Sequence, residues 1–104
     1  MIDLLKKAFK IGPSVDYAEL VKQGAVILDV RTKGEYKGGH IQGSINIAVD
    51  ELLNNLHRFP DTQKTIITCC ATGFRSASAN RMLRSKGYNN VHNAGSWVSL
   101  QNKI

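Results

Sequence analysis

The sequence predicts an α/β domain with a mainly parallel central sheet flanked by helices on both faces. Three observations carry this prediction: apolar runs of strand length, segments of helical character between them, and short connections that contain Gly or Pro. Near-continuous apolar runs are typical of strands covered on both faces. In such sheets ligands bind beyond the carboxyl ends of the strands.

Two helices are expected before the first strand. Apolar residues at positions 2, 5 and 9 have helical spacing with lysines on the other side, and Gly12-Pro13 ends this segment. Ser14 or Asp16 can cap a second helix that runs to about Gln23.

Strands and helices then alternate. Residues 25–30 form a near-continuous apolar run that predicts the first strand, and residues 44–47 predict the second. Between them, residues 33–37 predict a short helix. After them, Asp50 is expected to cap a helix over residues 50–56.

The last third of the chain continues the pattern. The β-branched run at 65–69 predicts a strand, and residues 76–86 predict a helix that ends at Gly87. A last short strand is expected at 90–93, followed by a terminal helix at 95–102.

Length and composition fit one small domain. With 104 residues, 42% hydrophobic and 21% charged, the chain has room for one core. We expect a helical extension over residues 1–12 and a single domain over residues 13–104. The apolar runs are too short to cross a membrane, and the N-terminus does not read as a signal peptide. The expected location is therefore the cytoplasm, with no membrane partner.

The net charge of +6 raises the question of a nucleic-acid partner. The positive residues are dispersed, with no dense basic run and no aromatic-interleaved motif, so we expect none. The excess of positive charge instead suits a field that draws small anions toward a site.

The two cysteines, Cys69 and Cys70, are adjacent. Neighbours on a strand point to opposite faces, so a structural disulfide between them is not expected. Adjacent thiols and three scattered histidines lack the spacing of zinc ligands, so no metal is expected. Reactive chemistry is the main use left for at least one thiol.

Cys70 stands where a predicted strand meets a predicted helix. A short Gly-containing turn follows it, and Ser76 opens a segment of helical character. A helix N-terminus offers unpaired N–H groups and a partial positive charge, and both favour a thiolate over a thiol. The same amides can hold an incoming oxyanion. The sequence thus predicts an enzyme whose nucleophile is Cys70.

Separate stretches of the chain carry family-like motifs. They are DVRT at 29–32 with Glu35-Tyr36, GHIQGSINI at 39–47, CATGFRS at 70–76 and, more weakly, NAGSW at 93–97. Together they resemble a single-domain rhodanese, a sulfurtransferase, over about residues 14–102. The resemblance implies the three-layer rhodanese-like fold. Two departures are Ala94, where the family often has a glycine, and the unusual Cys69.

The resemblance implies a sulfur-transfer cycle on Cys70. The thiolate would attack the outer sulfur of a small anionic donor such as thiosulfate, release sulfite and become a persulfide. An acceptor (cyanide, a thiol or a protein thiol) would then remove the sulfur, and no cofactor is required. The loop expected to bind substrate, with backbone N–H groups that stabilise the anions, consists of Ala71, Thr72, Gly73, Phe74, Arg75 and Ser76.

Residues around the loop have supporting roles. Arg75 either holds the donor and lowers the thiol pKa, or pairs with a carboxylate such as Asp29 and keeps the loop in shape. Asp29 and Arg31 end a buried strand, where charges should be paired, and we expect them to tie that strand end to the loop. His40 is expected to make structural hydrogen bonds, and Trp97 to wall the pocket or pack in the core.

Two other functions stay open. Counted from Cys69, Arg75 completes the Cys-x5-Arg spacing of Cys-based phosphatases, so a phosphatase or arsenate reductase is one alternative. Cys69 is otherwise a small buried residue or a resolving thiol. The second alternative is a module that relays persulfide sulfur or binds partners without efficient thiosulfate turnover.

Overall fold

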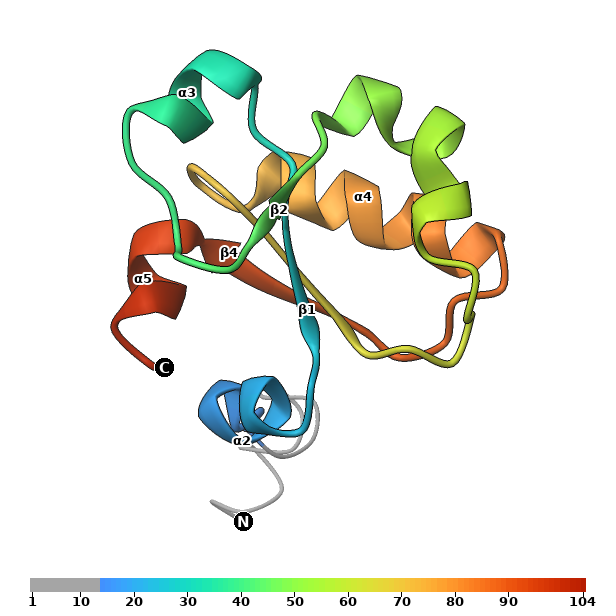
Figure 1. Ribbon diagram of the computed structural model, residues 1–104, viewed down its shortest axis with the longest axis horizontal. Helices are drawn as coiled ribbons and strands as arrows, with labels where there is room; N and C mark the ends of the chain where they lie inside the picture. The colour runs from blue at the N-terminus through green and yellow to red at the C-terminus, as the bar shows by residue number, and fades with distance from the viewer. Residues whose placement is uncertain (1–13) are drawn as a thin grey trace, which may run out of the picture.

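The computed structural model describes residues 14–104, so the helix expected within residues 1–12 lies outside the described residues. At its centre is a four-stranded sheet of order β2-β1-β3-β4, in which every neighbouring pair is parallel (Figure 1). The strands are β1 (Val26–Asp29), β2 (Ile45–Asn46), β3 (Ile66–Cys70) and β4 (Val91–Ser96). The predicted α/β class with a parallel sheet is confirmed.

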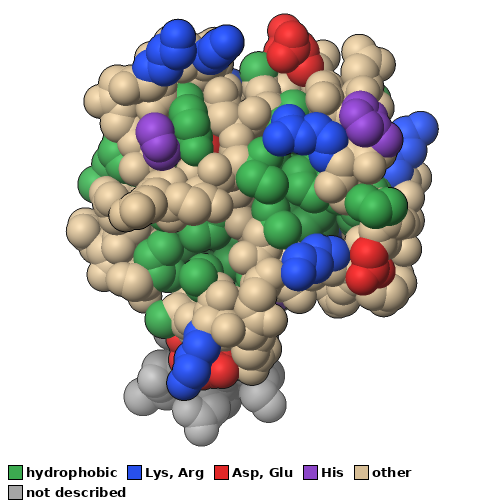
Figure 2. All heavy atoms as spheres, viewed as in Figure 1, with side chains coloured by type: hydrophobic (Ala, Val, Ile, Leu, Met, Phe, Trp, Pro, Cys, Tyr) green, Lys and Arg blue, Asp and Glu red, His purple; other side chains and the backbone are tan. Residues whose placement is uncertain are grey.

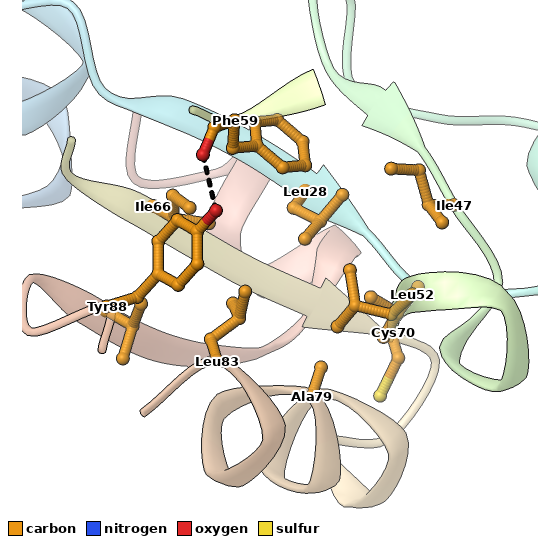
Figure 3. Packing of buried hydrophobic residues seen from close by; sticks show 11 residues of the cluster. Leu28, Ile47, Leu52, Phe59, Ile66, Cys70, Ala79, Leu83 and Tyr88 are labelled. Carbon is orange, nitrogen blue, oxygen red and sulfur yellow. Dashed lines mark hydrogen bonds between the residues drawn. The ribbon is translucent and has the colours of Figure 1, made fainter. Parts of the chain in front are cut away.

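Helices cover both faces of the sheet. They are α2 (Tyr17–Lys22), α3 (Lys33–Lys37), the 3-10 helix η1 (Val49–Arg58), α4 (Phe74–Ser85) and α5 (Trp97–Gln101). One buried cluster joins Leu28 of β1 to Leu83 of α4 and to η1 (Figure 3). A second joins Ile27 of β1 to Leu100 of α5 and to α2. Neighbouring residues of one strand therefore pack into hydrophobic clusters on opposite faces of the sheet. The fold thus has three layers, with the sheet between two layers of helices.

Local signals set several helix ends as expected. Asp16, rather than Ser14, caps α2: its carboxylate accepts a hydrogen bond from the Glu19 amide at 3.1 Å. Gly87 follows the end of α4 with a φ of +93°, and its amide donates to the Arg84 carbonyl at 3.1 Å. This left-handed glycine closes the last turn of α4.

Three element boundaries differ from the prediction. The segment after β2 is a 3-10 helix that follows Ala48 without a side-chain cap, so the expected capping role of Asp50 is wrong. Ala48 is extended and its carbonyl already accepts the Glu51 amide at 2.9 Å, which leaves Asp50 inside the first turn. Helix α4 begins at Phe74 rather than Ser76, because Gly73 turns the chain directly into it. Strand β4 extends to Ser96, into residues expected to be helical.

Side chains on the surface are mixed in type. Figure 2 shows Lys and Arg in several separate groups over one face rather than in a single patch. Within residues 14–104, no helix has both the length and the apolar character needed to cross a membrane.

The parallel arrangement places one edge of the sheet at the candidate site. Cys70 is the last residue of β3, and β1 and β4 flank that strand. The loop that leaves β3 at this edge leads straight into α4 (Figure 1).

Candidate active site

Hydrogen-bond donors converge on the sulfur of Cys70. The Gly73 N–H lies 3.0 Å from Sγ and the Ser76 N–H 3.4 Å. The Ser76 hydroxyl oxygen is 3.3 Å from the same atom. Because α4 begins at Phe74, these groups belong to the turn before the helix and to its first turn, where amides have no partner within the helix.

This surrounding controls the pKa of the Cys70 thiol. Burial raises that pKa, but hydrogen bonds from the Ser76 hydroxyl and from the amides of Ser76, Gly73 and Thr72 lower it by more. The pKa of Cys70 is therefore below the ordinary value for a thiol, as a nucleophilic cysteine requires.

Cys69 has the opposite environment. Its side chain belongs to the cluster with Ile27 and Leu100, whereas Cys70 belongs to the cluster on the other face. Burial and, second, the charge of Asp29 raise the pKa of Cys69 to about 12. The interpretation of Cys69 as a small buried residue is confirmed, and both cysteines are free thiols.

Gly73 makes the shape of the loop possible. Its φ of +103° lies in the left-handed region, where side chains other than hydrogen are strained. A Cβ at this position would also meet the Cα of Gly95 on β4 at 3.4 Å. Gly73 therefore supplies the backbone angle on which the shape of the loop depends.

Arg75 pairs with Glu35 of α3. Its guanidinium donates two hydrogen bonds to the Glu35 carboxylate, at 2.7 and 3.0 Å. The Arg75 hydrogen bond and then the Thr32 amide lower the pKa of Glu35 to about 2. The interpretation that Arg75 pairs with a carboxylate is confirmed, but the partner is Glu35 and not the candidate Asp29, because α3 and not the end of β1 presents the carboxylate that faces α4.

Asp29 and Arg31 pair with each other inside the fold. Their side chains meet at 2.7 Å, and Arg31 also donates to the Gly39 carbonyl at 2.7 Å. The guanidinium stacks on Trp97, 4.7 Å from the ring centroid. This pair therefore ties the end of β1 to the segment after α3, and not directly to the Cys70 loop as expected. The link between α3 and the loop is the Glu35 carboxylate.

His40 and Trp97 serve the packing. His40 stacks on Tyr36 with ring centroids 3.8 Å apart, and its Nδ1 lies 2.7 Å from the Tyr36 carbonyl oxygen. Trp97 is half-buried against the cluster of Leu100. The structural role expected for His40 is confirmed.

The rim of the loop is exposed while the sulfur is not. Ala71 and Thr72 are exposed, and Phe74 shows 81% of its surface. Cys70 itself exposes none. A donor therefore reaches Sγ only when groups around the loop move aside.

Asn93 is a residue of the site to which the sequence assigned no role. Its Oδ1 lies 2.7 Å from the Ser76 hydroxyl and 2.9 Å from the Gly95 amide. Asn93 opens the NAGSW segment, whose position at the functional edge was the available signal. The identity of its partner on α4 depended on packing.

A separate hollow of about 520 Å³ lies between α3 and η1, where β2 ends. It contains none of the loop residues 70–76. Its lining is apolar at the floor and mostly cationic at the rim, and consists of Lys33, Tyr36, Lys37, His40, Asn46, Ile47, Ala48, Glu51, Asn55 and Arg58. Across residues 14–104, no three His, Cys, Asp or Glu side chains converge as metal ligands.

Comparisons with known proteins agree with this geometry. The thiosulfate sulfurtransferase PspE of Escherichia coli is 36% identical over 69 residues, which are 65% of this chain and 66% of that protein. About a third of that relative therefore lies outside the match. The thiosulfate sulfurtransferase GlpE of Pseudomonas fluorescens is 32% identical over 84 residues, 81% of this chain and 76% of that one.

Solved structures show the same fold. A rhodanese with anions from E. coli superposes with a TM-score of 0.69 at 32% identity, covering 73% of this chain and 91% of that one. The human single-domain sulfurtransferase TSTD1 has a TM-score of 0.72 at 27% identity, covering 89% and 98%. The model of the rhodanese-like domain family matches residues 15–103. This chain therefore belongs to the rhodanese-like domain family.

Proposed function

We propose that this protein is a sulfurtransferase that moves a sulfane sulfur from thiosulfate or a persulfide donor, through Cys70, to a thiophilic acceptor. Cyanide, a thiol or a protein thiol can serve as that acceptor. The observation that supports the proposal most is the pair of backbone N–H groups, from Gly73 and Ser76, that are aimed at Cys70 Sγ. The names of relatives as thiosulfate sulfurtransferases point the same way.

In the first step the Cys70 thiolate attacks the outer sulfur of the donor. A sulfur–sulfur bond forms on Cys70 as that of thiosulfate breaks, and sulfite leaves with the electron pair. The backbone N–H groups of Gly73 and Ser76 stabilise negative charge where it collects, first on the thiolate and then on the persulfide. The lowered pKa of Cys70 favours the thiolate that makes this attack.

In the second step an acceptor attacks the outer sulfur of the persulfide. The bond between the two sulfurs breaks and its electron pair returns to Cys70, so the thiolate is restored and no redox partner is consumed. The N–H groups that stabilised the attacking thiolate now stabilise the leaving one. Two displacements through one covalent intermediate give ping-pong kinetics.

The remaining loop residues shape the approach to the sulfur. Ala71, Thr72 and Phe74 form the exposed rim and influence which donors and acceptors pass. Arg75 keeps its positive charge beside the loop while Glu35 holds it in place. Asp29 and Arg31 support this arrangement from behind, because they fix the end of β1 and the segment after α3.

The alternative phosphatase or arsenate reductase has no support from this geometry. It needs Cys69 as the nucleophile in a Cys-x5-Arg cradle with Arg75. The loop amides instead face Cys70, and Cys69 lies on the other side of the sheet with a pKa of about 12.

Steady-state transfer from thiosulfate to cyanide tests the proposal. We expect thiocyanate and sulfite as products, parallel lines in double-reciprocal plots, full loss of turnover in Cys70→Ser and retained turnover in Cys69→Ser. Turnover that survives Cys70→Ser contradicts the proposal. The proposal is also contradicted if the wild type shows no turnover with either thiosulfate or a protein persulfide as the donor.

A further inference from the structure

Asn93 lies beside the loop because of an irregularity in the sheet. The register between β3 and β4 runs from the Thr68–Asn93 pair to the Cys69–Gly95 pair, which leaves Ala94 as an extra residue on β4. Bulges of this kind bend a strand and re-aim its side chains, and they often occur next to active sites.

Two hydrogen bonds fix the orientation of the Asn93 amide. The Gly95 N–H lies 2.9 Å from Oδ1, and because it is a donor this atom is the carbonyl oxygen. The Ser76 hydroxyl lies 2.7 Å from the same oxygen and 3.2 Å from the Gly73 carbonyl oxygen. Both oxygens only accept, and the shorter contact makes Asn93 the main acceptor of the single Ser76 hydrogen.

The Ser76 hydroxyl also faces the sulfur of Cys70 at 3.3 Å, and it has one hydrogen to donate. While that hydrogen points to Asn93, the hydroxyl offers the sulfur only lone pairs. Lone pairs suit a neutral thiol, which can donate its S–H. An anionic sulfur instead needs the hydrogen, and the hydroxyl must turn away from Asn93 to supply it.

We propose that Asn93 is a positioning residue that competes with the Cys70 sulfur for the Ser76 hydrogen, and so sets how readily that sulfur becomes anionic. Ser76 keeps its proton throughout: the hydroxyl rotates, and the thiol proton passes to solvent. After the hydroxyl rotates, Asn93 Oδ1 still accepts the hydrogen bond from the Gly95 N–H. The rotation therefore breaks only the hydrogen bond between Ser76 and Asn93. The inference rests on the proposed function, because the same rotation serves the thiolate and the persulfide.

Apart from the charge that Asn93→Asp adds, the charged groups around the sulfur are the same in every comparison below. They are Arg75 on α4, its partner Glu35 on α3, and the pair of Asp29 and Arg31 at the end of β1. The neighbouring thiol, Cys69 on β3, is replaced by serine in every variant. A difference in the alkylation midpoint between variants of residue 93 therefore arises from residue 93 itself and from the Ser76 hydroxyl that it holds.

The test is the pH dependence of Cys70 alkylation by iodoacetamide in a Cys69→Ser background, which needs no sulfur donor. Asn93→Asp holds the Ser76 hydrogen more strongly and adds a negative charge. We expect its midpoint to rise by roughly one pH unit, which is about tenfold less thiolate at neutral pH. Asn93→Ala removes the nearer acceptor and leaves only the longer contact to the Gly73 carbonyl oxygen to compete with the sulfur, so its midpoint falls below that of the parent.

Two controls isolate the mechanism. Asn90→Asp makes the same exchange of an amide for a carboxylate at the residue before β4, away from the loop. We expect it to leave the alkylation midpoint of Cys70 unchanged. In a Ser76→Ala background there is no hydrogen to release, so Asn93→Ala no longer lowers the midpoint.

Opposite shifts in Asn93→Asp and Asn93→Ala support the proposal. Shifts in the same direction, or no shift in either, overturn it and leave Asn93 as a residue that only holds the loop in shape. If Asn93→Asp does not fold, the sign of the Asn93→Ala shift decides. If Asn93→Ala does not fold, the Asn93→Asp shift must shrink in the Ser76→Ala background, where only the added charge remains; an undiminished shift overturns the proposal. Sulfur loading from thiosulfate and from a protein persulfide is read separately by mass on the same proteins. Opposite midpoint shifts without loading from either donor therefore contradict the proposed function and not this inference.

Discussion

At the scale of single residues, adjacent thiols differ because neighbours on β3 face opposite sides of the sheet. Cys70 points toward α4, where amides without helical partners favour its anion. Cys69 points into an apolar cluster that disfavours any charge. One step along the strand thus separates the proposed nucleophile from a packing residue.

This difference predicts selective alkylation. A pH of 7 is about five units below the Cys69 pKa of about 12, so that thiol stays protonated. The pKa of Cys70, by contrast, is lowered from the ordinary thiol value. Iodoacetamide should therefore label Cys70 and leave Cys69 unmodified in the folded protein, as read by peptide mass mapping. Labelling of both cysteines only after denaturation is the matching control. Faster labelling of Cys69 than of Cys70 in the native protein would contradict this assignment.

Much of the site at this scale was predictable from the sequence. A cysteine at a strand end, before a Gly-containing turn and a helix, is a local pattern, and the structure puts Cys70 and Gly73 where that pattern indicates. The partner of Arg75 was not predictable, because Asp29 and Glu35 are both acidic residues of the same motif. Only the position of α3 relative to α4 in the folded chain decides between them. The same holds for Asn93, whose role depends on a bulge.

At the scale of elements, the site depends on how α4 is joined to β3 and held against α3. Gly73 lets the chain reverse within the loop, and the pairing of Glu35 with Arg75 bridges the two helices. The 3-10 form of η1 was not predictable from residues 50–56, since its first turn is set by the extended Ala48 and by packing of Leu52 beneath it.

Replacing Gly73 should damage the loop more than the rest of the fold. Gly73→Ala places a Cβ at a φ of +103°, which costs about 1–2 kcal/mol in free energy of unfolding, and moves the amide away from Sγ. We expect lower stability in urea and a higher alkylation midpoint for Cys70. Gly34→Ala is the matched control, because nothing lies within 4 Å of its Cβ and α3 gains a better helix former. Equal effects of the two substitutions would contradict the role given to the Gly73 turn.

The ion pair between α3 and α4 predicts a pH-dependent contribution to stability. Because the folded pKa of Glu35 is about 2 and its ordinary value 4.5, the contribution is full above pH 4.5 and is lost as the pH falls through about 2. Glu35→Gln should therefore lower the melting temperature slightly at pH 6, since the pair is exposed, and not at pH 2.

Glu19→Gln is the control for that change. It makes the same exchange of carboxylate for amide on α2, at a residue without an ion pair among the described residues. Its melting temperature should track the wild type at both values of pH. A deficit of Glu35→Gln that persists at pH 2 would mean that the ion pair is not its cause.

At the scale of the whole molecule, the chain carries a net charge of +6 spread over its length. On the face that Figure 2 shows, the Lys and Arg side chains stand in separate groups, so we expect them to act through a summed field. Such a field raises the rate at which small anions meet the protein, and salt screens it over about 10 Å at 0.1 M.

The rate of sulfur transfer from thiosulfate should therefore depend on salt. We expect kcat/KM for thiosulfate to fall as sodium chloride rises from about 0.01 to 0.5 M, because screening weakens the attraction of the dianion. The alkylation of ionised Cys70 by neutral iodoacetamide, measured well above its midpoint, should change little over the same range. An equal salt effect on both reactions would point to a change in the loop instead of the field.

The central claim is that Cys70 carries the transferred sulfur, and intact-protein mass spectrometry after brief thiosulfate treatment tests it most directly. We predict that the wild type and Cys69→Ser gain the mass of one sulfur atom, that cyanide removes it, and that Cys70→Ser gains none. A sulfur adduct on Cys70→Ser, or its loss only in Cys69→Ser, would contradict the account.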